Sequence, residues 1–324
     1  MPSLDDFAST KLENLAARGQ RRELTDTARK AAGTAVRGNR DVISFCCNDY
    51  LNLSQHPAVK KAAQDAVEEF GVGSGASRLV TGNHPLFAQL ETRLARLKGT
   101  DAALVFGAGY LANTGIIPSL VGAGDIVFAD ELSHACLMSG ARMSDAQVHV
   151  FRHNDMAHLE ELLTAHRASA RNALMVTDGV FSMDGDLAPL PQMVALASEH
   201  ESWLMTDDAH GLGVIGGGHG SARAFGDVPL DIPLQMGTLS KAVGGYGGYV
   251  CASQPVIDLL KSRARTFVYS TGLPPANAAA AIAALEIIES DKDLIEQPVR
   301  KAAQFCQEAE LPAPQSPIVP VIIG

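Results

Sequence analysis

The stretch Trp203-Leu204-Met205-Thr206-Asp207-Asp208-Ala209-His210 joins a short apolar run to two carboxylates and an imidazole. Similar apolar runs alternate with helical stretches along the chain, which is typical of a mostly parallel sheet with helices on both faces. The expected strands are 103–106, 126–129, 148–152, 174–177, 203–206, 234–237 and 248–252. The expected helices are 57–70, 85–98, 111–121, 133–144, 156–168, 190–200 and 273–290. The sequence therefore predicts an α/β fold.

Three segments are expected along the 324 residues. Residues 1–40 are predicted to form one or two amphipathic helices, broken by Gly33 and Gly38, as an N-terminal extension. Residues 41–284 are predicted to form a large α/β domain that opens with a strand at 41–50. Residues 285–324, with a last strand at 318–323, would begin a C-terminal domain. We expect that domain to be truncated, because so short a segment cannot close a core.

The composition excludes several classes of function. A net charge of -10 argues against general binding to nucleic acid. The basic residues between 18 and 40 are an exception, either a solvated face or a dock for an anionic substrate or carrier. Five cysteines without a CxxC pair suggest buried free thiols in a reducing compartment. Without a signal peptide or a long apolar span, the chain is expected in the cytoplasm, away from membranes.

Polar groups follow five of the expected strands. They lie at residues 107–110, 130–134, 178–184, 207–210 and 238–241. In open α/β sheets, ligands bind beyond the carboxyl ends of the strands. The five segments should therefore converge on one site.

Lys241, in Gly237-Thr238-Leu239-Ser240-Lys241, indicates the chemistry when it is combined with Asp207. Pyridoxal phosphate needs an amine for its aldehyde, a carboxylate for its pyridine nitrogen and small donors for its phosphate. Lys241, Asp207 and Thr238 supply these groups. His210 suits contact with the phenolic oxygen, and His134, at a helix start, could stack on the ring. The amides of Gly109 and Tyr110 are further candidates for the phosphate.

Each of these residues also has a purely structural alternative. Lys241 alone would more often be a surface lysine, Asp207 a cap or turn residue, and His210 a core histidine. The GxGxxG pattern at residues 211–216 suggests a dinucleotide site, but the next four residues, Gly-Gly-His-Gly, cannot continue a helix. The scattered His149, His153, His158 and His166 form no metal-binding motif, so no metal is expected.

The chain resembles the α-oxoamine synthase family of fold-type I pyridoxal phosphate enzymes. The matching segments are 48–51, 73–82, 132–135, 153–155, 179–186, 207–211, 238–241 and 269–271. Those around Ser182 and Lys241 are the most specific. The run at 73–82 favours the member that acts in biotin synthesis over those that make aminolevulinate, aminoketobutyrate or sphingoid bases.

The resemblance implies a set of roles. Lys241 would hold the cofactor and remove the Cα proton, Asp207 would pair with the pyridine nitrogen, and His210 and Ser182 would contact the phenolic oxygen. His134 would stack on the ring and help to orient the substrate. The remaining implied contacts are Gly109, Tyr110 and Thr238 with the phosphate, Ser270 and Thr271 with the phosphate of a neighbouring subunit in a homodimer, and Asn48, Arg21 and Arg22 near the substrates.

The implied reaction is a decarboxylative condensation of L-alanine with a pimeloyl thioester of coenzyme A or acyl carrier protein. Another α-oxoamine synthase, a transaminase or side-chain-cleaving enzyme, and a non-catalytic homologue stay open as alternatives. In the family, an arginine that binds the amino acid carboxylate lies in the C-terminal domain beyond the segment matching 318–323. A chain that ended at Gly324 would therefore be expected to turn over weakly or not at all.

Overall fold

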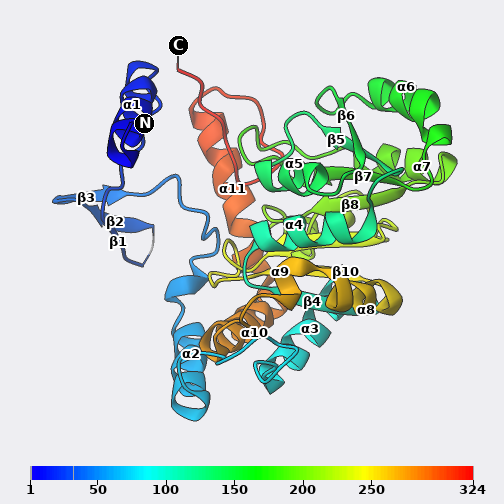
Figure 1. Cartoon of the computed structure of the whole chain (residues 1–324). Helices are drawn as coiled ribbons and strands as arrows, with labels where there is room; N and C mark the ends of the chain where they lie inside the picture. The colour runs from blue at the N-terminus through cyan, green and yellow to red at the C-terminus, as the bar shows by residue number, and fades with distance from the viewer. Residues whose placement is uncertain (1, 32, 324) are drawn as a thin grey trace. The chain divides into compact units, whose positions relative to one another are not determined.

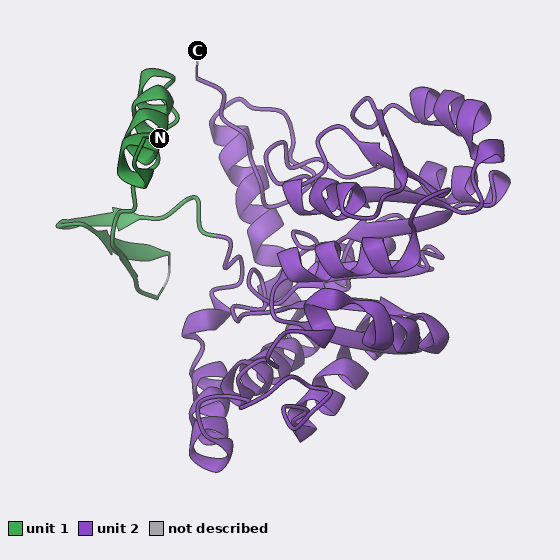
Figure 2. Cartoon of the chain, viewed as in Figure 1, with its two compact units in different colours: residues 1–47 green, residues 48–324 purple. Residues whose placement is uncertain are grey.

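The computed structural model describes residues 2–31 and 33–323. The chain divides into two compact units, Met1–Cys47 and Asn48–Gly324, which Figure 2 distinguishes by colour. The first unit contains a three-stranded sheet and the second a seven-stranded sheet. The residues expected to carry the chemistry belong to the second unit, apart from Arg21 and Arg22.

In the first unit, helix α1 spans Leu4–Ala17 and begins with a capping box between Ser3 and Asp6. Beyond it, β1 (Thr27–Arg29), β2 (Thr34–Arg37) and β3 (Arg40–Ile43) form an antiparallel sheet. The prediction of helices throughout residues 1–40 is therefore wrong beyond α1. The strand predicted over residues 41–50 is also too long, because β3 ends at Ile43.

Turn chemistry explains this difference. Arg37 pairs with Arg40, so only two residues connect β2 to β3. The first of them, Gly38, has a φ of 57°. Two-residue hairpin turns require a positive φ, which glycine adopts without steric cost. Gly38 thus joins two strands rather than marking the end of a helix.

The seven-stranded sheet of the second unit has the order β4-β10-β9-β8-β7-β5-β6. Its strands are β4 (Ala102–Phe106), β5 (Ile126–Asp130), β6 (Gln147–Phe151), β7 (Ala173–Asp178), β8 (Trp203–Asp207), β9 (Leu234–Thr238) and β10 (Gly248–Ala252). β10 is antiparallel to both of its neighbours, whereas the other neighbouring pairs are parallel. The seven predicted strands and the mostly parallel α/β class are confirmed.

Helices cover both faces of this sheet, as Figure 1 shows. One face packs against α4 (Gly109–Leu120), α5 (Ala135–Arg142), α8 (Gln254–Arg263) and α9 (Arg265–Val268). The other face packs against α2 (Pro57–Phe70), α3 (Pro85–Lys98), α6 (Met156–His166), α7 (Leu190–Glu199) and α10 (Pro275–Ser290). β4 sends Leu104 and Phe106 to the first core and Ala103 and Val105 to the second, since successive strand side chains alternate.

The C-terminal part differs from the prediction. Helix α11 (Lys292–Glu308) follows α10 and was not expected, whereas the strand expected at 318–323 is wrong. An extended segment becomes a strand only when its backbone groups pair with a neighbouring strand. Among the described residues, no strand pairs with residues 318–323. The domain boundary predicted after residue 284 falls inside α10, so a separate third segment stays a prediction.

A search of the described residues finds no helix that is both long and apolar enough to cross a bilayer.

A buried ion pair involves Asp208, the residue that follows the last residue of β8. Lys98 donates to a carboxylate oxygen of Asp208 at 2.6 Å and to the carbonyl of His219 at 2.7 Å, and both charged side chains are almost fully buried. The glycine-rich segment wraps around this pair. A Cβ atom on Gly211 or on Gly220 would lie within 2.0 Å of an Asp208 oxygen. The glycines are thus needed for close packing, and no α-helix follows them.

We expect Lys98→Met to lower the free energy of unfolding by about 3–5 kcal/mol, because it leaves a buried carboxylate without its cation. Urea unfolding measures this. Lys61→Met is the matched control, since the Lys61–Asp65 pair is exposed and should contribute less than about 1 kcal/mol. Equal losses in the two variants would contradict the assignment.

Candidate active site

The predicted site residues converge at the carboxyl edge of the parallel strands. Asp207, the last residue of β8, is directly opposite Asp178 of β7 and Met236 of β9 in the strand register. Two residues beyond Met236, Thr238 ends β9 and leads into the segment that carries Lys241. Sheet pairing therefore brings together groups that are far apart in the sequence.

Lys241 lies in a short chain of hydrogen bonds. Its Nζ is 2.5 Å from Nε2 of His210, and Nδ1 of His210 is 2.7 Å from the hydroxyl of Tyr50. Burial lowers the pKa of Lys241, and the carboxyl groups of Asp207 and Asp178 oppose this effect. Burial, with Lys241 and His134 nearby, lowers the pKa of His210 to about 3. A neutral imidazole therefore contacts an amine that loses its proton more easily than an exposed lysine does.

The carboxylate of Asp207 is buried and contacts three donors, one of which is the thiol of Cys136, 3.9 Å from Oδ2. Its Oδ2 accepts a hydrogen bond from Nδ2 of Asn113 at 2.7 Å, and its Oδ1 accepts one from the backbone of Ala209 at 3.0 Å. Since a carboxylate has about four acceptor positions, it retains capacity for a further donor. Asp207 can therefore serve a protonated ring nitrogen.

Asp178, the strand neighbour of Asp207, is also buried. Its pKa is raised well above the ordinary value, by burial first and then by the nearby Asp207. Two close, buried carboxyl groups do not ionise independently. Asp178 also accepts a hydrogen bond from the backbone N–H of His134 at 2.8 Å, and so fixes the start of α5.

His134 is the N-cap of α5. Its Nδ1 accepts a hydrogen bond from the N–H of Cys136 at 3.2 Å and lies 2.8 Å from the sulfur of that residue. Burial, and after it the charge of Asp207, raises the pKa of the Cys136 thiol to about 12. The imidazole of His134 is thus held by a neutral thiol at the carboxyl edge of the sheet.

The residues predicted to bind phosphate also meet. α4 starts at Gly109 and Tyr110 without a side-chain cap, so its first N–H groups lack intrahelical acceptors. A Cβ atom on Gly109 would lie 3.5 Å from Oγ1 of Thr238, which places that hydroxyl beside the helix start. A free helix N-terminus beside a hydroxyl is a suitable place for a phosphate. The amine, the acid and the phosphate donors together fit pyridoxal phosphate.

The other predicted residues are less closely tied to this cluster. Ser182 is half-buried in the turn after β7, and Asn48 is exposed at the start of the second unit. Ser270 is half-buried, while Thr271 is exposed and forms an isolated bridge with Ser77. Arg21 and Arg22 are exposed, outside helix and strand, in the first unit. The roles of all six remain predictions.

Several members of the cluster were not predicted from the sequence. Asn113 and Cys136 approach Asp207 from α4 and α5, and Tyr50 contacts His210 from a loop. Asn113 could have been noticed as a buried polar residue between the apolar Ala112 and Ile116. The role of Cys136 has no such signal, because it depends on how α4 and α5 pack.

Two of the cysteines differ from the prediction of buried thiols. Cys136, Cys251 and Cys306 are buried, but Cys46 is exposed and Cys47 is half-buried. Among the residues that the structure describes, no cluster of His, Cys, Asp and Glu side chains is arranged to hold a metal ion.

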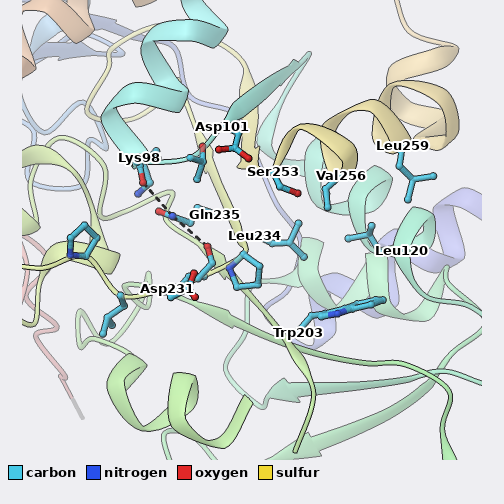
Figure 3. Close-up of a pocket in the computed structure, with 16 residues that line it drawn as sticks. Lys98, Asp101, Leu120, Trp203, Asp231, Leu234, Gln235, Ser253, Val256 and Leu259 are labelled. Atoms are coloured by element: carbon cyan, nitrogen blue, oxygen red, sulfur yellow. Dashed lines mark hydrogen bonds between the residues drawn. The ribbon is translucent and has the colours of Figure 1, made fainter. Parts of the chain in front are cut away.

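A cavity of about 510 Å³ lies elsewhere in the second unit (Figure 3). Trp203 and Leu234, the first residues of β8 and β9, line it, whereas Asp207 and Thr238 end the same strands. The cavity is therefore at the opposite edge of the sheet, away from Lys241. Trp203, the only tryptophan of the chain, is separated from Asp207 by about 13 Å of strand.

Comparison with known families and curated proteins gives consistent matches. The model of the aminotransferase class I and II family matches residues 40–323. An 8-amino-7-oxononanoate synthase of Beijerinckia indica is 61% identical over 324 residues, which are 100% of this chain and 84% of the relative. An enzyme of the same name from Methylocella silvestris is 65% identical over 289 residues, 89% of this chain and 82% of the relative.

Solved structures agree with these matches. A serine palmitoyltransferase of Sphingomonas wittichii has a TM-score of 0.86 and 32% identity, over 94% of this chain and 77% of its own. A structure of SPT with a PLP internal aldimine has a TM-score of 0.85 and 30% identity, over 94% of this chain and 77% of its own. The 8-amino-7-oxononanoate synthase of Francisella tularensis has a TM-score of 0.69 and 26% identity, over 85% of this chain and 78% of its own.

The lowered pKa of His210 predicts an effect on stability. Between pH 6.5 and about 3, an unfolded histidine binds a proton that the folded site excludes, so the free energy of unfolding should fall as the pH decreases. Urea unfolding across this range tests it, with His210→Gln expected to show a weaker dependence on pH. Identical pH dependence in the parent protein and the variant would count against a neutral His210.

The cysteines should differ in reactivity, because only the thiolate is a nucleophile. At pH 8 we expect iodoacetamide to label the exposed Cys46 and to leave Cys136 and Cys251 unlabelled, since burial raises the pKa of both thiols to about 12. Peptide mass spectrometry measures the labelling, and labelling in urea is the control. Labelling of Cys136 at the rate of Cys46 would contradict its environment.

Proposed function

This chain belongs to the aminotransferase class I and II family, and we propose that it condenses L-alanine with a pimeloyl thioester to give 8-amino-7-oxononanoate. The condensation releases the carrier thiol and carbon dioxide. The observation that carries this proposal is 61% identity over all 324 residues with a protein named 8-amino-7-oxononanoate synthase. At this level of identity, we infer that the relative and this chain catalyse the same reaction in biotin synthesis.

The cofactor is pyridoxal phosphate, which supplies an electron sink for the charge that develops on the substrate carbon. Lys241 holds its aldehyde, Asp207 holds the proton of its ring nitrogen, and Thr238 with Gly109 and Tyr110 holds its phosphate. Ser182 and His210 bind its phenolic oxygen, and His134 stacks on its ring. The convergence of Lys241, His210, Asp207 and His134 at one edge of the sheet supports these assignments.

Lys241 also moves the proton of the substrate Cα. Removal of that proton requires the neutral amine, and burial favours it by lowering the pKa of Lys241. His210, 2.5 Å away, is neutral and can accept a hydrogen bond from the amine. The hydroxyl of Tyr50 fixes the other ring nitrogen of His210, so the imidazole keeps one orientation.

We infer that the working enzyme is a cytoplasmic homodimer that shares its active sites. Ser270 and Thr271 are then directed to the phosphate bound in the neighbouring subunit. The exposure of Thr271 supports this, because a residue that serves the partner's site must be accessible on its own chain. Of the five cysteines, Cys136, Cys251 and Cys306 are buried free thiols, which suits a reducing compartment.

The substrates are assigned to Asn48 and to the arginines of the first unit. Arg21 and Arg22 are exposed, which suits contact with an anionic carrier, either coenzyme A or an acyl carrier protein. Other α-oxoamine synthases, of the aminolevulinate or aminoketobutyrate type, are the nearest alternatives. The likeness to serine palmitoyltransferases, at 32% identity, is the reason to include serine in any substrate test.

The proposal predicts a substrate preference and a single attachment site. We expect release of carbon dioxide from alanine to exceed release from glycine or serine, and to require pimeloyl thioester rather than acetyl or palmitoyl thioester. Borohydride reduction of the loaded protein should place the cofactor on Lys241, as identified by peptide mass spectrometry. Lys241→Ala should lose both signals, whereas Lys261→Ala, at an exposed surface pair, should keep them.

Equal use of serine with a long acyl thioester would replace the proposed reaction with another condensation. A cofactor label on a different lysine would overturn the assignment of the site.

A further inference from the structure

Asn113 is a polar residue in an apolar setting. It lies in α4, where its neighbours Ala112, Ile116 and Ile117 are completely buried, and its own exposure is 0%. A buried amide is unfavourable unless its hydrogen bonds are made. Helix packing alone would be served better by an apolar side chain, so the amide needs another explanation.

The contacts of the amide point to Asp207. The Nδ2 atom of Asn113 donates to Oδ2 of Asp207 at 2.7 Å and lies 3.0 Å from the sulfur of Cys136. The opposite orientation of the amide would place its oxygen against the carboxylate, so electrostatics fixes which end faces Asp207. In this orientation Oδ1 is buried and has no hydrogen-bond partner within the described structure. The residue thus leaves an acceptor unsatisfied while both contacts are made by its donor end.

Packing leaves Asn113 little freedom to move. α5 crosses α4 so closely that a Cβ atom on Gly140 would lie 2.6 Å from the backbone oxygen of Asn113. Cys136, the second contact of the amide, comes from the same helix α5. The position of the amide is therefore fixed by two packed helices rather than by a loop.

The same helix serves both ends of the proposed cofactor site. Gly109 and Asn113 are one turn apart, so they share a face of α4 and differ by about 6 Å along its axis. Gly109 is at the helix end assigned to the phosphate, and Asn113 is at the acid assigned to the ring nitrogen. A separation of this size along the helix axis suits a pyridine ring placed between the phosphate site at Gly109 and the acid beside Asn113.

We propose that Asn113 is a positioning residue that sets the rotation of the Asp207 carboxylate toward the ring nitrogen of pyridoxal phosphate. The amide holds Oδ2 from one side while the backbone of Ala209 holds Oδ1. The carboxylate as a whole keeps acceptor capacity for the proton of the ring nitrogen. The proposal rests on the proposed cofactor, but it assigns a residue that acts through Asp207 and does not touch the ring itself.

This role is tested by a double-mutant-type cycle, in which the affinities of two protein variants are compared for two forms of the cofactor. The cofactor-free parent protein and Asn113→Ala are titrated with pyridoxal phosphate and with an analogue in which a C–H group replaces the ring nitrogen. Quenching of Trp203, the only tryptophan, reports binding, because cofactor absorption overlaps its emission. Absorbance provides a second measurement.

We expect Asn113→Ala to weaken binding of pyridoxal phosphate at least tenfold and binding of the analogue less than threefold. An analogue without the ring nitrogen has no proton for Asp207 to hold, so the orientation of the carboxylate should not matter for it. A general loss of structure would weaken both ligands equally, and that outcome would overturn the proposal.

Asn113→Leu is the second variant. It fills the space of the amide without a donor and should show the same selective loss, even if the smaller alanine fails to fold. Ser119→Ala is the matched control in α4, because among the described residues the hydroxyl of Ser119 bonds only to the carbonyl of Gly115. It should leave both affinities unchanged. If the parent protein binds neither ligand, the proposed cofactor itself is wrong. If the parent protein binds both ligands and the Asn113 variants lose affinity for both equally, the cofactor assignment stands and only the proposed role of Asn113 is wrong.

Discussion

The site depends on two consecutive acids at the end of β8 that serve opposite sides of the sheet. Asp207 is bonded from α4 by Asn113, whereas Asp208 is bonded from α3 by Lys98. This follows from the alternation of side chains along an extended chain. One carboxylate therefore remains available for the cofactor, while its neighbour is neutralised within the protein. If both faced the same side, two buried negative charges would lie close together with one cation between them.

The pair of Lys98 and Asp208 also explains the most misleading feature of the sequence. Residues 211–220 contain a dinucleotide-like glycine pattern, but Gly211 and Gly220 approach Asp208 too closely for any side chain. Gly220 has a φ of 95° as well, which other residues rarely adopt. The glycines are thus explained by close packing around the buried pair of Lys98 and Asp208. The apparent nucleotide motif results from this packing.

The sequence predicted the parts of this structure that depend on local patterns. Six of the seven strands were identified as mostly buried, nearly continuous apolar runs, whereas β6 alternates apolar and polar residues and is largely unburied. The residues beyond the strand ends, such as Asp207 and Lys241, were therefore placed at one edge. The strands of the first unit were missed because Gly38 marks a hairpin turn as readily as a helix end. Asn113 carries a local signal, a polar residue within an apolar helix, but its partner Asp207 depends on the packing of α4, and the contact of Cys136 with Asp207 depends on the packing of α5, which no local pattern encodes.

The low polarity of the site's surroundings determines which of its groups carry charge. Burial lowers the pKa of Lys241 and of His210 and raises that of Asp178 and of Cys136, so in each case the neutral form is favoured. Asp207 differs in its contacts, because side-chain and backbone donors are directed at both of its oxygens. Hydrogen bonds of this kind stabilise a carboxylate in a buried position. We infer that these two contacts prepare Asp207 for the ring nitrogen of the cofactor, and that Asn113 sets the orientation of its carboxylate.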